Sequence, residues 1–172
     1  MRRDGLLREI PFTTLSDYLW LLRACCETLA PLGEHAMLYL AAAVSDFYIP
    51  ASSMSEHKLQ SSEGAPEVKL SLVPKMLTPL VRHWVPKAFV ISFKLETDAN
   101  LLRAKARKAL ETYGHRLVIA NLLQTRKTEV IAVTKDTDDK LELTQHDINE
   151  GLEIEKKIVA TVAMRHEEFI KM

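Results

Sequence analysis

Residues 88–121 read AFVISFKLETDANLLRAKARKALETYGHRLVIAN, and this stretch decides the fold. The apolar runs at 88–93 and 117–120 are typical of buried strands. Between them, Asp98 is a helix-capping residue, apolar side chains recur on one helical face, and Gly114 is placed to end the helix. A strand, a helix and a second strand in this order predict two parallel strands joined by a crossover helix.

The same alternation continues on the N-terminal side. Capping hydroxyls around Thr14 precede an amphipathic helix that is expected to end near Pro31. The continuous apolar run 36–44 predicts a strand buried on both faces, as in a parallel sheet. Residues 68–72 alternate as in a half-exposed strand, and a short helix is expected within residues 74–86.

On the C-terminal side, segments 129–135 and 140–144 predict a hairpin around residues 136–139. One final amphipathic helix is expected to carry the apolar residues Ile148, Leu152, Ile158, Val162 and Phe169. All the elements together predict a single domain over residues 1–172. Its expected fold is three-layer α/β: a mostly parallel, Rossmann-like sheet with helices on both faces and an antiparallel hairpin at one edge.

Composition excludes several classes of protein. The chain has 172 residues, of which 47% are hydrophobic and 27% charged, as in an ordinary globular protein. Its 23 basic and 23 acidic residues give a net charge of zero, which argues against a general nucleic-acid binder. No window approaches the roughly 20 apolar residues of a membrane span, and charges interrupt any secretion signal. The adjacent Cys25 and Cys26 fit a reducing, cytoplasmic location, and Cys26 is expected in the core.

Ligands of open parallel sheets bind beyond the carboxyl ends of the strands, so the residues at these ends are the candidates. Ala42 and Ala43 are small enough for close approach of a ligand, and Asp46 adds a carboxylate. The alternative is that the alanines pack against a helix and Asp46 belongs to a turn. The five glycines form neither a Rossmann fingerprint nor a P-loop, so lysines such as Lys58 and Lys75 would have to contact phosphate, unless they are solvated surface charges. The six histidines lie far apart, which makes a dedicated metal site improbable.

Five ordered segments carry a resemblance to a known family: 41–50, 56–62, 73–77, 92–98 and 118–121. In this order they are similar to the second half of phosphopantothenoylcysteine synthetases of the eukaryotic type. Full-length members begin with a further part that includes a glycine-rich phosphate loop.

The resemblance implies an amide-forming ligase of coenzyme A biosynthesis. In that family the carboxylate of 4′-phosphopantothenate attacks the α-phosphate of ATP with assistance from Mg²⁺, and the amine of L-cysteine displaces the nucleotide from the acyl-nucleotide. A cytosolic homodimer is implied as well. The alternative is a catalytically incompetent fragment or isoform that binds the pantothenate-side ligand or dimerises with the full-length enzyme.

The resemblance also implies site residues. Ala42, Ala43 and Asp46 match positions that hold phosphopantothenate, Phe93 and Asn121 match nucleotide contacts, and Lys58 matches a lysine on the triphosphate. Bacterial relatives carry two further nucleotide-contacting lysines before the third strand. At those positions this chain has Ala109 and Tyr113, with Lys105 and Lys108 nearby but out of register, so these roles are not transferred.

Overall fold

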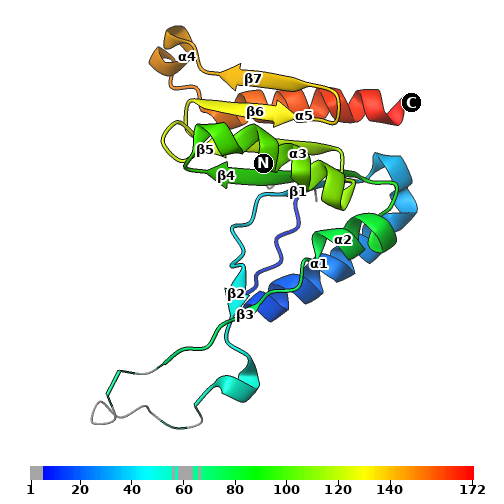
Figure 1. Cartoon of the computed structure of the whole chain (residues 1–172). Coiled ribbons are helices and arrows are strands. Elements are labelled where there is room, and N and C mark those ends of the chain that lie inside the picture. Colours follow the sequence, from blue (N-terminus) through cyan, green and yellow to red (C-terminus); the bar gives the residue numbers. More distant parts are fainter. Residues whose placement is uncertain (1–5, 56, 58–63, 66) are drawn as a thin grey trace. The chain divides into compact units, whose positions relative to one another are not determined.

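The computed structural model describes residues 6–55, 57, 64, 65 and 67–172 (Figure 1). The chain divides into two compact units, one made of Met1–Ala41 with Leu77–Met172 and the other of Ala42–Met76. The first contains a five-stranded sheet and is called the sheet unit; the second is called the small unit. A single folding domain over residues 1–172 stays a prediction.

The sheet has the strand order β1 (Met37–Leu40), β4 (Phe89–Glu96), β5 (Leu117–Leu122), β6 (Glu129–Val133) and β7 (Asp138–Glu142). β1, β4 and β5 are parallel neighbours, whereas β6 and β7 form an antiparallel hairpin at the edge. Four of the five strands therefore run in one direction, and the predicted mostly parallel sheet with an edge hairpin is confirmed.

Helix α3 (Ala99–Tyr113) covers one face of the sheet. The Asp98 carboxylate accepts a hydrogen bond from the Asn100 N–H at 2.8 Å, and Gly114 ends the helix at φ 76°, a left-handed conformation that favours glycine. Between these ends, the helix buries Leu102, Ala106 and Leu110 against Val118, Ala120 and Val133. The crossover helix predicted within residues 88–121 is confirmed.

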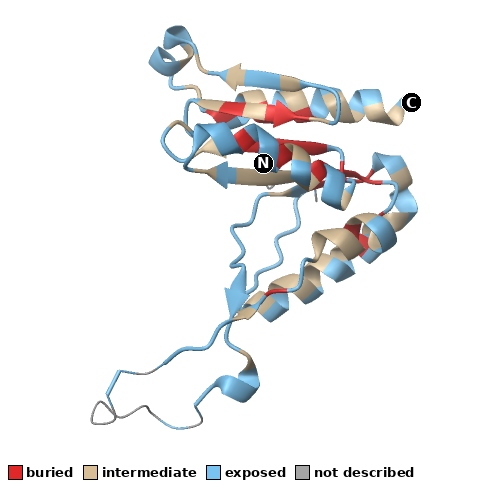
Figure 2. Ribbon diagram, viewed as in Figure 1, coloured by how far each residue is buried: buried red, intermediate tan, exposed pale blue. Residues whose placement is uncertain are grey.

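Helix α5 (Ile154–Ile170) covers the opposite face. Its buried residues pack on side chains that alternate with those facing α3; the cluster contains Phe89, Ile91, Leu117, Ile119, Val130, Ala132, Ile154, Ile158 and Val162. The buried stretches of the central strands are visible in Figure 2. Helices on both faces of the sheet complete the three-layer arrangement.

Helix α1 (Leu15–Leu29) begins at Thr14, which forms a reciprocal capping box with Asp17. Together with the 3₁₀ segment η1 (Ala30–His35), α2 (Leu77–Pro79) and the π-helical turn η4 (Leu80–Trp84), it packs on a core that includes Cys26. Burial raises the pKa of the Cys26 thiol to about 11, so this cysteine is inert, as expected for a core residue.

Three predicted elements are corrected. The strand expected over 36–44 is β1 alone, and its Met37 and Tyr39 are 37% and 40% exposed because β1 pairs only with β4 among the described strands. The single final helix is wrong: Gly151, at φ 68°, separates α4 (Gln145–Asn149) from α5. The half-exposed strand expected over 68–72 is reduced to β3 (Ser71–Leu72), and Leu72 is exposed.

The small unit contains β2 (Phe47–Tyr48), the 3₁₀ turn η2 (Ala51–Ser53) and β3, with β2 and β3 paired as a short antiparallel ladder. Within the described part of the chain, no helix has the length and apolar character needed to cross a membrane.

Candidate functional site

The carboxyl ends of β4 and β5 bring together two of the predicted nucleotide contacts. In the parallel ladder, Phe93 lies opposite Ile119 and Leu95 lies opposite Asn121. Because residues two apart on a strand share a face, Phe93 and Asn121 lie on the same face of the sheet, the one that α5 covers. They are neighbours at the edge where ligands of parallel sheets bind.

Phe93 forms an aromatic pair with Tyr39 of β1. The ring centroids lie 5.0 Å apart with an interplanar angle of 67°, an edge-to-face contact. Tyr39 is 40% exposed and Phe93 is half-buried, so the pair presents apolar ring surface to solvent. Burial, and to a smaller extent the charge of Glu155, raises the pKa of the Tyr39 phenol, which therefore stays neutral at physiological pH. Such a pair can pack on a planar ring.

The Asn121 side chain is half-buried and carries an unsatisfied acceptor. Its Oδ1 atom is buried and has no hydrogen-bond partner among the described residues. Buried amide oxygens in folded proteins are nearly always paired, and one that is not calls for an explanation. Because Asn121 lies at a strand end, where ligands bind, a hydrogen-bond donor of a bound ligand would explain the unpaired oxygen directly.

A cavity of about 440 Å³ lies beside β4 and α3. The residues that line it are Leu77, Ser92, Phe93, Lys94, Lys105, Lys108, Ala109, Thr112 and Tyr113. The Nζ atoms of Lys94 and Lys105 lie 3.4 Å and 2.9 Å from the two carboxylate oxygens of Glu96. The hydrogen bond from Lys105, together with Lys94, lowers the pKa of Glu96. Three lysines against one carboxylate leave this lysine-lined cavity with an excess of positive charge.

The lysine-lined cavity brings together residues that occupy the positions of the bacterial lysines and residues that do not. Ala109 and Tyr113, which occupy the positions of the bacterial lysines, line it together with Lys105 and Lys108. Positions 105, 108, 109 and 112 follow the i, i+3, i+4, i+7 spacing of one helical face. Lys105 and Lys108, although they are out of register with the bacterial lysines, therefore line the same cavity as Ala109 and Tyr113.

The structure also contains a serine–histidine contact that has no local signal in the sequence. Ser92 Oγ lies 2.7 Å from His115 Nε2, and His115 is only 6% exposed. Burial lowers the pKa of His115 to about 4, so the ring is neutral at physiological pH, and its Nδ1 atom has no partner among the described residues. The two residues meet because β4 and β5 pair in a particular register.

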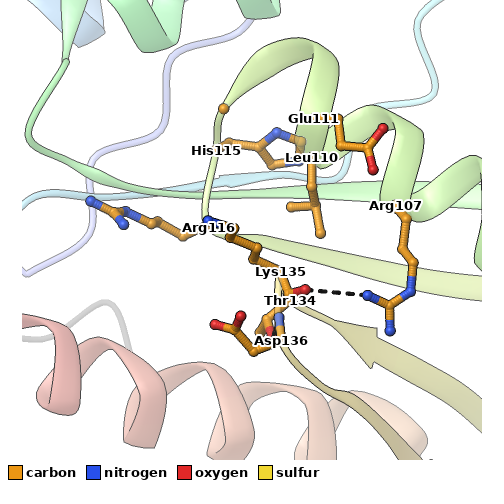
Figure 3. Close-up of a pocket in the computed structure, with 9 residues that line it drawn as sticks. Arg107, Leu110, Glu111, His115, Arg116, Thr134, Lys135 and Asp136 are labelled. Carbon is orange, nitrogen blue, oxygen red and sulfur yellow. Dashed lines mark hydrogen bonds between the residues drawn. The ribbon is translucent and has the colours of Figure 1, made fainter.

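His115 lines a second cavity of about 410 Å³, at the amino end of β5 (Figure 3). There, Arg107 Nη1 donates a hydrogen bond to the Lys135 carbonyl oxygen at 3.2 Å. Arg116 and Asp136 also line this cavity, so its charges are mixed. It lies at the opposite end of β5 from Asn121.

The small unit holds the three residues predicted to bind phosphopantothenate. Ala42 and Ala43 are exposed, which argues against their packing beneath a helix. The Lys75 Nζ atom lies 2.5 Å from Asp46 Oδ1, and the Asp46 carbonyl accepts a hydrogen bond from the Val73 N–H at 2.9 Å. Lys58, predicted to contact the triphosphate, lies outside the described residues.

Comparison with known proteins gives the family. Residues 23–168 match the family described as DNA/pantothenate metabolism flavoprotein, C-terminal domain. The chain belongs to this family. The resemblance to phosphopantothenoylcysteine synthetases drawn from the sequence is thereby confirmed.

Curated proteins with high similarity to the chain are named ligases. The human phosphopantothenate–cysteine ligase is 54% identical over 166 residues, which cover 96% of this chain and 53% of the human protein. The yeast phosphopantothenate–cysteine ligase CAB2 is 37% identical over 193 residues, covering 99% of this chain and 51% of the yeast protein. The chain thus spans about half the length of the curated relatives it matches.

Solved structures agree with this relationship. A mutant of Cab2 in complex with phosphopantothenate-cysteine superposes with a TM-score of 0.84 at 39% identity, covering 94% of this chain and 53% of that one. The DNA/pantothenate metabolism flavoprotein from Streptococcus pneumoniae, at 22% identity and a TM-score of 0.60, shares the fold; the match covers 92% of this chain and 78% of that one.

For this family member, the roles of Ala42, Ala43, Asp46, Phe93, Asn121 and Lys58 stay predictions. Among the residues that the structure describes, no group of three or more His, Cys, Asp or Glu side chains could hold a metal ion.

Proposed function

We propose that the chain carries out phosphopantothenate–cysteine ligation in coenzyme A biosynthesis, as the names of its relatives indicate. The observation that carries this proposal is that Phe93 and Asn121 lie on the same face of the sheet at the carboxyl ends of adjacent parallel strands, in a chain 54% identical to the human ligase. An aromatic ring beside an unsatisfied buried amide is suited to a nucleoside.

In the proposed reaction, a carboxylate oxygen of phosphopantothenate bonds to the α-phosphorus of ATP and pyrophosphate leaves. The cysteine amine then bonds to the acyl carbon and loses a proton, the nucleoside monophosphate leaves, and an amide remains. Both steps concentrate negative charge on phosphate oxygens, which preorganised cations stabilise.

The residues divide this work between binding and charge stabilisation. Phe93 packs on the base or ribose, and the Asn121 amide bonds to the nucleoside. The lysine-lined cavity, with Lys94, Lys105 and Lys108, receives the polyphosphate, and Lys58 is proposed to contact the same group. Ala42, Ala43 and Asp46 hold phosphopantothenate. Mg²⁺ in this proposal arrives bound to the nucleotide phosphates, as is usual for this ion.

The test is sustained pyrophosphate release by the purified chain with ATP, Mg²⁺, phosphopantothenate and cysteine. Repeated turnover is expected only when all three substrates are present, because the acyl-nucleotide accumulates without the amine. Phe93→Ala is expected to lower turnover, whereas Phe12→Ala, which removes a ring that is 52% exposed, is the matched control. A folded chain that releases no pyrophosphate, or releases it without phosphopantothenate, contradicts the proposal.

A second candidate function is association with a full-length synthetase without catalysis. It is favoured by the outer edge of β1, where Met37 and Tyr39 are exposed and only β4 is a neighbour among the described strands. Unpaired strand edges are sites of chain association. Co-purification of the chain with full-length synthetase supports this candidate, and failure to associate at micromolar concentration removes it. A homodimer and a cytosolic location are proposed on the same resemblance.

A further inference from the structure

The ion pair between Asp46 and Lys75 is held in place by the fold of the small unit. β2 and β3 pair Phe47 with Leu72 and Tyr48 with Ser71, so the chain segments on either side of them are adjacent. The hydrogen bond from the Val73 N–H to the Asp46 carbonyl extends this pairing by one step. Lys75, two residues farther along, then reaches the Asp46 carboxylate at 2.5 Å.

This geometry answers an electrostatic problem in the proposed function. Phosphopantothenate carries a carboxylate and a phosphate, so an isolated aspartate in its binding site would repel it. An ammonium group in contact with Asp46 neutralises that carboxylate before the ligand arrives. A carboxylate has about four lone-pair sites, so it can bind the ammonium and still accept a hydrogen bond from a hydroxyl or amide of the ligand.

We propose that Lys75 is a positioning residue for phosphopantothenate: it fixes and neutralises Asp46, and acts on the ligand through that carboxylate. The inference rests on the proposed function, because it requires that Asp46 bind this substrate. Both side chains are more than half exposed, so the pair contributes little to folding and its effect is expected in ligand affinity.

The test is calorimetric titration of the chain with phosphopantothenate. The variants are Asp46→Asn, Lys75→Met, Lys75→Arg, the double variant Asp46→Asn with Lys75→Met, and Lys69→Met as the control for loss of an exposed lysine in the same unit. Lys75→Met is expected to weaken binding roughly tenfold or more, because the bond it removes involves charged groups. Lys75→Arg keeps the charge and retains most of the affinity.

Coupling between the two residues distinguishes positioning from direct contact. If Lys75 acts through Asp46, the double variant binds phosphopantothenate about as weakly as whichever single variant has the lower affinity. Losses that multiply overturn the inference, because they indicate independent contacts with the ligand. Pantothenate without its phosphate gives a second measure: Lys75→Met weakens both ligands if Asp46 is the mediator, and only the phosphorylated one if Lys75 binds the phosphate.

Failure of the inference and failure of the proposed function give different results. If the unmodified chain does not bind phosphopantothenate, both the proposed function and the inference about Lys75 are wrong. If it binds and Asp46→Asn weakens binding while Lys75→Met behaves like Lys69→Met, the proposed function stands and the inference is overturned. Titrations are interpreted only for variants whose thermal unfolding transition matches that of the unmodified chain. If Lys75→Met does not fold, Lys75→Gln replaces it.

Discussion

The sheet unit and the small unit are stabilised by different interactions. In the sheet unit, Ile91, Leu117 and Ile119 are 0% exposed and lie between helices on both faces. In the small unit, Val73 is the one buried apolar residue among those described, while Leu72 is 68% exposed. Packing holds the first unit, whereas a short ladder and polar contacts hold the second.

This difference separates the proposed nucleotide contacts from the proposed phosphopantothenate contacts. Phe93 and Asn121 lie on strands whose positions are fixed by a packed core. Asp46 is positioned by a main-chain hydrogen bond and an exposed ion pair. Changes in the packed core of the sheet unit are therefore expected to alter stability, and changes in the small unit to alter ligand binding with little effect on stability.

The largest expected effect comes from truncating matched apolar residues in the two units. Ile119→Ala leaves a cavity in a fully buried cluster and is expected to cost about 2–5 kcal/mol of unfolding free energy. Leu72→Ala removes a side chain that is already exposed, so its effect is expected to stay within about 0.5 kcal/mol. Urea unfolding measures both, and equal losses would remove the distinction between the units.

The next effect is a loss of stability in acid that belongs to the sheet unit. Burial lowers the pKa of His115 to about 4, from 6.5, so the unfolded chain binds more protons between these values. The contribution of His115 to stability is complete above pH 6.5 and is lost as pH falls toward 4. Between pH 7 and pH 4.5 the loss is expected to be about 2–3 kcal/mol.

Comparison with His115→Gln isolates this effect from the titration of carboxylates. The variant is expected to lose less stability than the unmodified chain over the same pH range, as measured by urea unfolding at each pH. Identical pH dependence in the two proteins would show that His115 is not desolvated in the folded state.

Local signals explain why the central fold could be predicted from the sequence. Asp98 and Gly114 mark the ends of α3, and the flanking strands are buried enough to appear as apolar runs. The exposure of Tyr39 could not be predicted, because an apolar run does not tell which strand lies at a sheet edge. Gly151 divides the last helix although the apolar spacing continues across it.

The proximity of Phe93 and Asn121 was predictable, because both lie at the carboxyl ends of strands. Phe93 and Asn121 follow from the family resemblance and come together as the parallel register requires. Counting back along the sequence assigns no role to the lysines of α3, yet one helical face carries Lys105 and Lys108 into the cavity that Ala109 and Tyr113 also line. The Ser92–His115 contact depends on cross-strand register, which residue spacing alone does not give.

Asn121 offers an affinity effect without a stability cost. Its Oδ1 atom makes no hydrogen bond among the described residues, so Asn121→Ala removes no bond from the folded chain and leaves stability within about 0.5 kcal/mol. If a nucleoside donor satisfies this oxygen, ATP binding weakens roughly tenfold. Calorimetry with ATP measures the affinity. A variant that unfolds more easily yet binds ATP normally would assign Asn121 to the fold.

The smallest expected effect concerns the charge of the lysine-lined cavity. Lys108 lines it and makes no ion pair among the described residues, so Lys108→Gln removes one positive charge without freeing a carboxylate. ATP affinity is expected to fall only a few-fold, because salt screens an exposed charge, and the difference should shrink as salt rises. Lys135→Gln, in the cavity at the opposite end of β5, is the matched control. Equal losses in both variants would indicate a general effect of net charge, whereas a loss confined to Lys108→Gln places the polyphosphate beside α3.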